Sequence, residues 1–537
     1  MSHCAEQGAV SPAIQSHTRR VARAAIIVMV FFVLSRAMGL LREVVIARQF
    51  GTSAELDAYL AAFRIPDLLF ALMAGGALGS ALIPVLSDHL ARDDERAAWK
   101  LASAVLNWVV LAMGGMAALV ALLAPVLVRT VIAPGFTPAQ QALTAELMRW
   151  MLLSTLIFGV SGIVMGILNA RQHFTLPALA PAVYNVAITL GAWLLGPSLG
   201  VRGAVIGVVA GAAAHLLVQL PALHQLNVRY WPRLAPYDPG VREVGRLMAP
   251  RALGLAAVEL NHLVNVVLAS GLAAGSLAAL NYGRMMMLLP EGIIAQSVAI
   301  AAFPTFSALV ARNEHAAMQR VFLTTLRSVL YLTLPATVGL ILLREPLVVT
   351  LLQRGAFDAH SSAATAWALL FYALGLASHA ALEIITRAFY AAHDTRTPVG
   401  VGVAAMAANA LLSVALMALF RQLDWAPHGG LALANTLATT AEMGVLLYLL
   451  HRRLGILRDA HATIGALARI GAGCSITAVT LLGVNAVFAE APAWLQCGLG
   501  IILGGGMYAL TTLGLRCDEP TVLMRTLWRR MRRDVPA

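Results

Sequence analysis

Residues 100–128 decide the class of this protein, because they read KLASAVLNWVVLAMGGMAALVALLAPVLV with one charged side chain, Lys100. An apolar stretch of about 20 residues is long enough to cross the hydrocarbon core of a bilayer as a helix. The same character extends over the chain. Of its 537 residues, 59% are hydrophobic and 12% are charged, whereas a soluble domain carries about 25% charged residues. The composition therefore indicates an integral membrane protein and excludes a water-soluble enzyme.

Apolar segments of this kind recur along the whole chain, in two groups of six followed by one pair. They lie at about 24–47, 57–86, 100–128, 143–168, 178–197 and 202–224, then at 244–271, 277–309, 320–343, 362–391, 397–420 and 428–450, and finally at 462–488 and 493–515. We therefore predict an all-α membrane protein of about fourteen transmembrane helices. Its expected parts are a cytoplasmic tail (1–23), an N-lobe (24–228), an inter-lobe loop (229–243), a C-lobe (244–452), a helix pair (453–515) and a basic tail (516–537).

The two six-helix groups align with one another at an offset of 220 residues. This offset pairs Arg64 with Arg284 and Pro84 with Pro304, and it stays nearly constant over most of the two groups. We infer an internal duplication. Because each copy has an even number of spans, the copies enter the membrane in the same direction, as parallel repeats do. Two such bundles with a cavity between them form the usual architecture for alternating access.

The formal charge of +12 lies mainly in short loops between the apolar segments. On the side of the two termini we count 23 cationic residues, against six on the opposite side. The positive-inside rule therefore predicts that both termini are cytoplasmic. Cations in such short loops set the orientation of the helices in the membrane, and they are not clustered in a soluble domain. We therefore expect no nucleic-acid partner. The four cysteines lie far apart in sequence and without CxxC spacing, so we expect neither a metal site nor a disulfide framework.

The 24–47 segment carries charge at membrane depth. Arg36 lies near its middle, and Arg42 and Glu43 follow about a turn and a half later. Arg36, Gly39 and Glu43 share one helix face at i, i+3, i+7 spacing. An arginine at this depth must face protein or water, and its planar guanidinium matches phosphate oxygens. The alternative is that Glu43 pairs with Arg42 or Arg36 and only orders the bundle.

The repeat places two arginines, Arg64 and Arg284, at equivalent positions in the two halves. The same segments, 57–86 and 277–309, also contain the acids Asp57 and Glu291. We expect Arg64 and Arg284 to serve an anionic substrate, with Glu291 as polar support. The alternative is that these arginines extend to the interface and bind nothing.

Two other polar features are predicted to be structural. Glu383 and Arg387 are four residues apart in the 362–391 segment, a spacing that favours an intrahelical ion pair. His262 is expected to be a hydrogen-bonded packing residue. Neither feature is assigned to the substrate.

These motifs together resemble the MurJ/MviN family of lipid II flippases, within the multidrug/oligosaccharidyl-lipid/polysaccharide exporter superfamily. The resemblance covers about residues 24–515 and rests on Ser35-Arg36 through Gly39 to Arg42-Glu43, Asp57-Ala58-Tyr59, Phe63-Arg64-Ile65-Pro66-Asp67-Leu68-Leu69, Tyr282-Gly283-Arg284-Met285-Met286, Arg387-Ala388-Phe389-Tyr390-Ala391 and Asp394-Thr395-Arg396-Thr397-Pro398. It implies two six-helix lobes around a cationic cavity, with the last two helices forming a groove for a polyprenyl tail.

The resemblance also implies the substrate, lipid II, which would be moved from the cytoplasmic to the outer leaflet of the bacterial inner membrane for cell-wall synthesis. Substrate-binding residues would be Arg36, Arg42 and Arg284, to which we add Arg64. Gating or polar support would come from Glu43 and Asp57, to which we add Gly39 and Glu291. No catalytic residue and no cofactor are expected.

The driving force is expected to be the membrane potential, with an ion gradient as the alternative. Certain relatives are thought to bind sodium through acidic residues, where this chain offers a weak, uncharged set: Asn265, Asn409, Ser413 and Asn435. Without formal charge these groups would neutralise a bound sodium poorly.

Two other functions remain open at this point. The chain could export another lipid-linked oligosaccharide, which the same arginines would suit, or act as a polyprenyl-phosphate glycosyltransferase. Beyond lipid II, the expected partners are membrane lipids and the cell-wall synthesis machinery, and the expected oligomeric state is a monomer.

Overall fold

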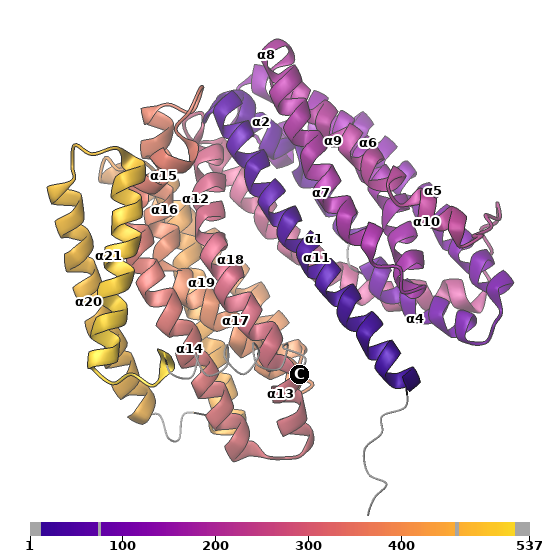
Figure 1. Cartoon of the computed structure of the whole chain (residues 1–537). Helices are drawn as coiled ribbons and strands as arrows, with labels where there is room; N and C mark the ends of the chain where they lie inside the picture. The colour runs from indigo at the N-terminus through magenta and orange to yellow at the C-terminus, as the bar shows by residue number, and fades with distance from the viewer. Residues whose placement is uncertain (1–11, 74–76, 457–460, 521–537) are drawn as a thin grey trace, which may run out of the picture. The chain divides into compact units, whose positions relative to one another are not determined.

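The computed structural model describes residues 12–73, 77–456 and 461–520, and within them the chain is helical and contains no strand (Figure 1). The far ends of the two predicted tails, residues 1–11 and 521–537, lie outside this description. The first helices are α1 (Pro12–Phe50), α2 (Ala54–Ala62), α3 (Arg64–Met73), α4 (Ala77–Ala91), α5 (Glu95–Leu127), η1 (Val128–Ile132), α6 (Pro138–Ala170), α7 (Thr175–Leu190), η2 (Gly191–Leu195), α8 (Gly196–Leu199), α9 (Val201–Leu217) and α10 (Leu220–Gln225). The remaining helices are α11 (Pro239–Ser270), α12 (Ser276–Glu291), η3 (Gly292–Gln296), α13 (Ser297–Ala311), α14 (His315–Leu342), α15 (Arg344–Leu352), α16 (Ala359–Leu374), α17 (Leu376–Ala391), α18 (Arg396–Gln422), α19 (His428–Leu454), α20 (His461–Val487) and α21 (Ala493–Gly514).

Among the described residues, eleven helices are long and apolar enough to cross a membrane. A twelfth span results if α16 and α17, which are bent by 44° at their junction, count as one. The other two predicted spans, 24–47 and 57–86, coincide with part of α1 and with the α2–α3–α4 succession. The all-helical membrane fold is therefore confirmed, whereas the count of fourteen spans stays a prediction.

The 57–86 segment, counted as one span, is divided into several helices, which agrees with the proline it contains. Helix α2 ends at Ala62 and α3 begins at Arg64. Pro66 lies in the first turn of α3, where its missing N–H costs no helical hydrogen bond, but it could not donate to Ala62 in a continuous helix. The proline therefore explains the break.

The chain divides into two compact units, residues 1–50 with 58–263, and residues 51–57 with 264–537. In the first unit, α1 packs on α7, α5 packs on α6, and α9 packs on both α6 and α7. Glycines at every fourth position of α9 permit its close approach to α7 and η2. A Cβ atom added to Gly207 would lie 2.8 Å from the carbonyl oxygen of Ala187, and one added to Gly191 would lie 2.6 Å from the Cα of Gly207. Small residues at this spacing are typical of membrane helix contacts.

The linker that leads out of the first six-helix group is held against α5. The backbone N–H of Trp231 donates to Ser103 Oγ at 3.0 Å, and the Trp108 indole donates to the carbonyl of Leu234 at 2.8 Å. The ammonium of Lys100 lies 5.5 Å from the centre of the Trp231 ring. The predicted inter-lobe loop is therefore ordered on the first unit.

In the second unit, α12 packs on α16, α18 on α19, and α13, α14 and α19 on α17. Its core contains buried residues from these helices, among them Phe306, Phe322, Ile384, Phe389 and Leu446. The final pair, α20 and α21, lie side by side, with α20 also on α14 (Figure 1). Tyr508 donates to the carbonyl of Tyr331 at 2.7 Å, and the Tyr331 and Thr512 hydroxyls are 2.9 Å apart, which ties α21 to α14.

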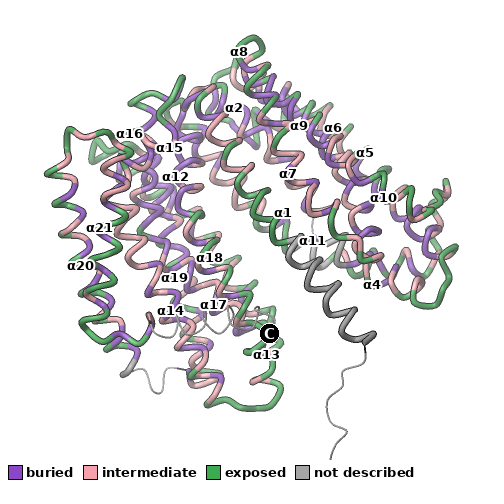
Figure 2. Tube along the Cα trace, in the orientation of Figure 1, coloured by how far each residue is buried: buried purple, intermediate pink, exposed green. Residues whose placement is uncertain are grey.

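Large apolar side chains remain exposed on the helices that pass as membrane spans. Leu122, Leu411 and Val479 are more than two-thirds exposed, and Figure 2 shows exposed residues alternating with intermediate and buried ones along α20 and α21. Apolar surface on this scale is unfavourable in water and is covered by lipid in a membrane protein. The burial pattern thus agrees with the composition.

Candidate functional site

The first unit holds Arg42 of α1 in a network of short hydrogen bonds. Its Nη2 and Nε donate to Glu43 Oε1 at 2.5 and 3.2 Å, and its Nη1 donates to Asn185 Oδ1 at 3.0 Å. All three nitrogens of this half-buried guanidinium are therefore engaged. The pairing of Glu43 with Arg42, which the sequence left as an alternative, is present.

Asn185, on α7, is a site residue that the sequence did not reveal. Its amide nitrogen donates to the carbonyls of Pro181 at 3.0 Å and Ser35 at 3.5 Å, which fixes the oxygen toward Arg42. Gly39 lies at the same contact, because a Cβ there would be 3.9 Å from the Asn185 amide nitrogen. That is an ordinary van der Waals distance, so a Cβ atom would fit at position 39 and the packing does not demand a glycine there.

Further charges of the first unit act on the same region. The carboxylate of Asp67 on α3 interacts electrostatically with Arg64, with Glu259 of α11 and with Arg42. Arg42 in turn interacts with Glu43 and with the phenol groups of Tyr59 and Tyr184. Arg64 and Arg42 thus both act on Asp67, and acids of the same unit accompany them. Their role in binding the substrate stays a prediction.

Arg36 differs from Arg42 in its surroundings. Its side chain is exposed, and its guanidinium carbon lies 5.3 Å from the centre of the Phe32 ring. Within the described part of the chain, no carboxylate pairs with it. Arg36 therefore offers a guanidinium that an external anion could bind without displacing an internal partner.

The second unit holds its own charge cluster on α12 and α17. Arg284, half-buried on α12, interacts electrostatically with Glu291 of α12, Tyr372 of α16 and His379 of α17. Glu383 and Arg387 form the predicted intrahelical ion pair, at 3.1 Å. Arg284 and Glu291, which the sequence placed in one site, therefore lie within electrostatic range of each other.

Asp57 lies elsewhere in the second unit and is 2% exposed. Its carboxylate accepts hydrogen bonds from the backbone N–H groups of Gly275, at 2.6 Å, and Ala278, at 2.8 Å. These groups belong to the first turn of α12, where a carboxylate is favoured by the helix dipole. Asp57 thus caps α12. Its role in gating stays a prediction.

The four residues of the weak ion site are spread over three helices. Asn409 and Ser413 are buried four residues apart on α18, Asn265 is half-buried on α11, and Asn435 of α19 lies 3.3 Å from the His379 ring. Among the described residues, no group of three or more histidine, cysteine or acidic side chains could hold a metal ion.

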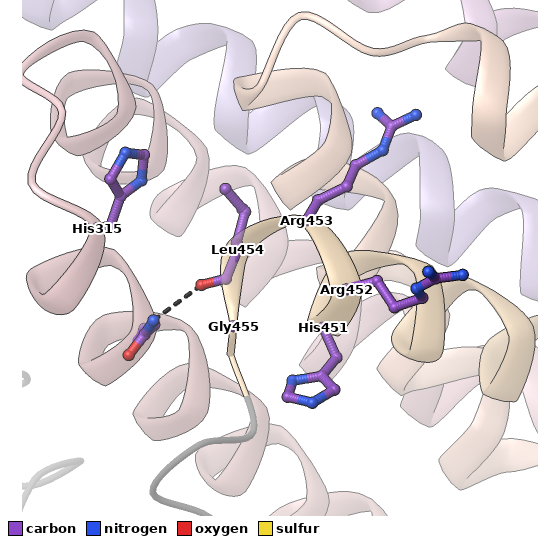
Figure 3. Close-up of a pocket in the computed structure, with 7 residues that line it drawn as sticks. His315, His451, Arg452, Arg453, Leu454 and Gly455 are labelled. Atoms are coloured by element: carbon purple, nitrogen blue, oxygen red, sulfur yellow. Dashed lines mark hydrogen bonds between the residues drawn. The ribbon is translucent and has the colours of Figure 1, made fainter.

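A cavity of about 410 Å³ lies where α19 ends, lined by His315, Gln319, His451, Arg452, Arg453, Leu454 and Gly455. Figure 3 shows that the side chains of His315, His451 and Arg452 point in different directions. The Gln319 amide donates to the Leu454 carbonyl, at 2.8 Å. Arg453 is already paired with Asp394. Because these cations do not converge, we do not assign the substrate to this cavity.

Comparison with known proteins gives one consistent result. The family model described as lipid II flippase MurJ matches residues 46–497. The probable lipid II flippase MurJ of Vibrio cholerae is 28% identical, with 93% of this chain and 94% of that protein covered. The lipid II flippase MurJ of Burkholderia cenocepacia is 30% identical, with 81% and 84% covered.

Solved structures agree at the level of the fold. A lipid II flippase MurJ in an inward closed conformation matches with a TM-score of 0.76 at 24% identity, covering 92% of this chain and 99% of that chain. An inward-facing multidrug resistance transporter of the MATE family, in the MOP superfamily, matches with a TM-score of 0.66 at 14% identity, covering 81% and 99%.

Proposed function

Because the chain belongs to the lipid II flippase MurJ family, we propose that it moves lipid II from the cytoplasmic to the outer leaflet by alternating access. It is a multi-pass protein of the bacterial inner membrane, and a transporter, not an enzyme. The match of the family model over residues 46–497 carries this conclusion. The internal duplication supports the alternating-access mechanism.

The arginines supply the chemistry that a diphosphate requires. Arg36 has no internal carboxylate partner among the described residues and can bind a phosphate oxygen directly. Arg42 is paired with Glu43, so a diphosphate must compete with that carboxylate, while Asn185 keeps the guanidinium in place. Arg284 is the cation that the second unit contributes. We infer that the exchange of Arg42 between Glu43 and the substrate accompanies binding.

The energetics and orientation follow from the charges. We infer that both termini are cytoplasmic, since the loops on that side carry most of the cations. A membrane potential contributes about 2.3 kcal/mol per elementary charge per 100 mV, which is enough to reset arginine-bearing lobes after release. Asn265, Asn409, Ser413 and Asn435 carry no formal charge and would neutralise a bound sodium poorly, so the scheme includes no tight sodium site. We infer that the protein acts as a monomer. It would receive lipid II from the cell-wall synthesis machinery on one side of the membrane and deliver it to that machinery on the other.

The test is complementation with a direct readout. Cells depleted of their own lipid II flippase would express this protein, and the measurement is the fraction of lipid II that an externally added cleaving probe reaches. Wild type should restore access, whereas Arg36→Ala and Arg284→Ala should not. Arg421→Ala, at an exposed position after the apolar part of α18, is the matched control and should behave as wild type. If inserted, stable wild type leaves access blocked, the assignment is wrong and other lipid-linked oligosaccharides become the substrates to test.

A further inference from the structure

Glu291, the last residue of α12, is a buried acid that the scheme above does not use. It is 5% exposed, and its Oε2 has no hydrogen-bond partner among the described residues. An ionised carboxylate without donors in an apolar environment costs several kcal/mol or more, whereas the neutral acid costs much less. An ionisable residue inside a membrane span is by default a candidate for function.

The charges that act on Glu291 come from two helices. Glu383 of α17 carries a like charge, and Arg284, seven residues earlier on the same face of α12, carries an opposite one. Helices α13 and α14, which pack against the adjacent η3, contribute no charge that interacts with Glu291 in the described part of the chain. Glu383 already has a partner in Arg387, at 3.1 Å.

The charge of Arg284 acts on several groups. Its field reaches Tyr372 and His379 as well as Glu291. The cluster thus contains two carboxyl groups: Glu383 lies 3.1 Å from Arg387, whereas Oε2 of Glu291 is buried without a hydrogen-bond partner among the described residues. A bound proton would remove the cost of leaving this buried oxygen charged and without a donor.

The local backbone gives this acid a means of changing its surroundings. Pro290 precedes it, and the π-helix η3 begins at Gly292, directly after it. Pro lacks the N–H that would hold the turn, and π-helical turns inside helices are frequent at functional positions. A small change at this junction would move Glu291 relative to Glu383 without disturbing the rest of α12.

We propose that Glu291 is a proton-binding site of the second unit, occupied in the conformation described here and emptied when the α12–η3 junction moves. The proton comes from water on one side of the membrane, binds one carboxylate oxygen and returns to water, and no other bond changes. Sodium fits less well, because it needs several oxygen ligands and a nearby arginine opposes it. This inference rests on the proposed function only for its consequence, which is that lipid II transport is coupled to protons.

The occupancy of the site can be measured without transport. Infrared spectra of the full chain in nanodiscs should contain the carbonyl stretch of a protonated carboxylic acid at neutral pH. This band should lose intensity in Glu291→Gln and stay unchanged in Glu345→Gln, a control whose side chain is 72% exposed. An unchanged band in folded Glu291→Gln would overturn the proposal, whether or not the protein flips lipid II.

The coupling is tested in proteoliposomes loaded with lipid II. Once the site loses its proton, the wild-type flipping rate should fall by up to about tenfold per pH unit as pH rises. The Glu291→Gln rate should not vary with pH, and the Glu383→Gln rate should fall at a lower pH, because one neighbouring negative charge is gone. Replacing sodium by potassium should change nothing. A wild-type rate that is independent of pH, or that requires sodium, would contradict proton coupling, whereas absence of wild-type flipping would contradict the proposed function instead.

Discussion

Asp57 caps α12, because its two carboxylate oxygens accept the backbone N–H groups of Gly275 at 2.6 Å and Ala278 at 2.8 Å. The residues joined by these two hydrogen bonds are more than 200 positions apart in the sequence. The bonds hold the short segment 51–57 in the second unit, although the residues before and after this segment, α1 and residue 58 onward, belong to the first unit. Gly275 has a φ of +86°, and a Cβ there would lie 2.1 Å from the carbonyl oxygen of Thr52. The contact therefore requires both a carboxylate at position 57 and a glycine at position 275.

We predict that Asp57→Ala destabilises the protein. Each of the two buried N–H groups would lose its acceptor, at a cost of about 1–3 kcal/mol per group. Asp57→Asn should lie between Ala and wild type, because it keeps one carbonyl oxygen. Thermal unfolding of the detergent-solubilised protein measures this, with Glu55→Gln, an exposed acid on the same helix, as the control. Equal melting temperatures for Asp57→Ala and Glu55→Gln would show that the cap does not contribute.

We predict that Asn185→Ala weakens lipid II binding through Arg42. The hydrogen bond from Arg42 Nη1 to Asn185 Oδ1 is 3.0 Å long, and a bond to a charged group contributes about 1.5–3 kcal/mol, which corresponds to roughly a 10- to 100-fold loss of affinity. Binding of lipid II to the purified protein is the measurement.

The same prediction has an internal control in the Arg42→Lys background. Lysine has a single ammonium group in place of the planar guanidinium, so it cannot donate to Glu43 and Asn185 in the same way at the same time. Asn185→Ala should therefore add little to Arg42→Lys, so that the two effects are not additive. Full additivity would mean that Asn185 acts on binding by a route that does not include Arg42.

These two contacts show where sequence reasoning ends. The pairing of Arg42 with Glu43 could be anticipated, because the residues are adjacent on one helix. Asn185 could not, because it is 143 residues away and an asparagine on an apolar helix carries no signal of its partner. The partners of Asp57 were equally hidden, since they are backbone N–H groups that every non-proline residue has.

The fold shows the same division. Hydropathy and length located the apolar helices, because burial in lipid imposes both. Hydropathy alone does not indicate that 57–86 is interrupted, because the break after Ala62 leaves the average apolar character unchanged. The signal for the break is Pro66 itself, whose missing N–H cannot continue the helix.

We predict a pH-dependent contribution to stability from Asp394, which lies in the turn between α17 and α18. The hydroxyl and the backbone N–H of Thr397 donate to its carboxylate, at 2.6 and 3.0 Å, and Arg453 pairs with it. The hydrogen bond from the Thr397 hydroxyl is the main cause that lowers the pKa of Asp394 below its ordinary value of 3.8. A depressed pKa stabilises the folded state above the ordinary value, and this stabilisation is lost as pH falls through the folded value.

The measurement for Asp394 is the melting temperature as a function of pH. Asp394→Asn should melt below wild type at neutral pH, and the difference should shrink as the pH falls below 3.8. Asp93→Asn is the control, since Asp93 is exposed and has a φ of +56° that asparagine tolerates. A difference between Asp394→Asn and wild type that persists unchanged in acid would show that the side chain acts through packing and not through its charge.

We predict that Gly207→Val disrupts the first unit, whereas Gly114→Val does not. A Cβ at Gly207 would lie 2.8 Å from the carbonyl oxygen of Ala187 and 2.9 Å from the Cα of Ile188, and these backbone atoms cannot turn aside as a flexible side chain can. At Gly114 on α5, nothing lies within 4 Å of the added atom. Both variants change helix propensity in the same way, so the comparison isolates the contact between α9 and α7.

Overpacking costs about 1–3 kcal/mol, and more where the backbone must move, so Gly207→Val should lower both the membrane yield and the melting temperature. Gly207→Ala should lower them less, because it adds only the first of the three carbons. If Gly207→Val retained the wild-type melting temperature, α9 and α7 would have to separate at no cost. The glycines at every fourth position of α9 would then have no packing role.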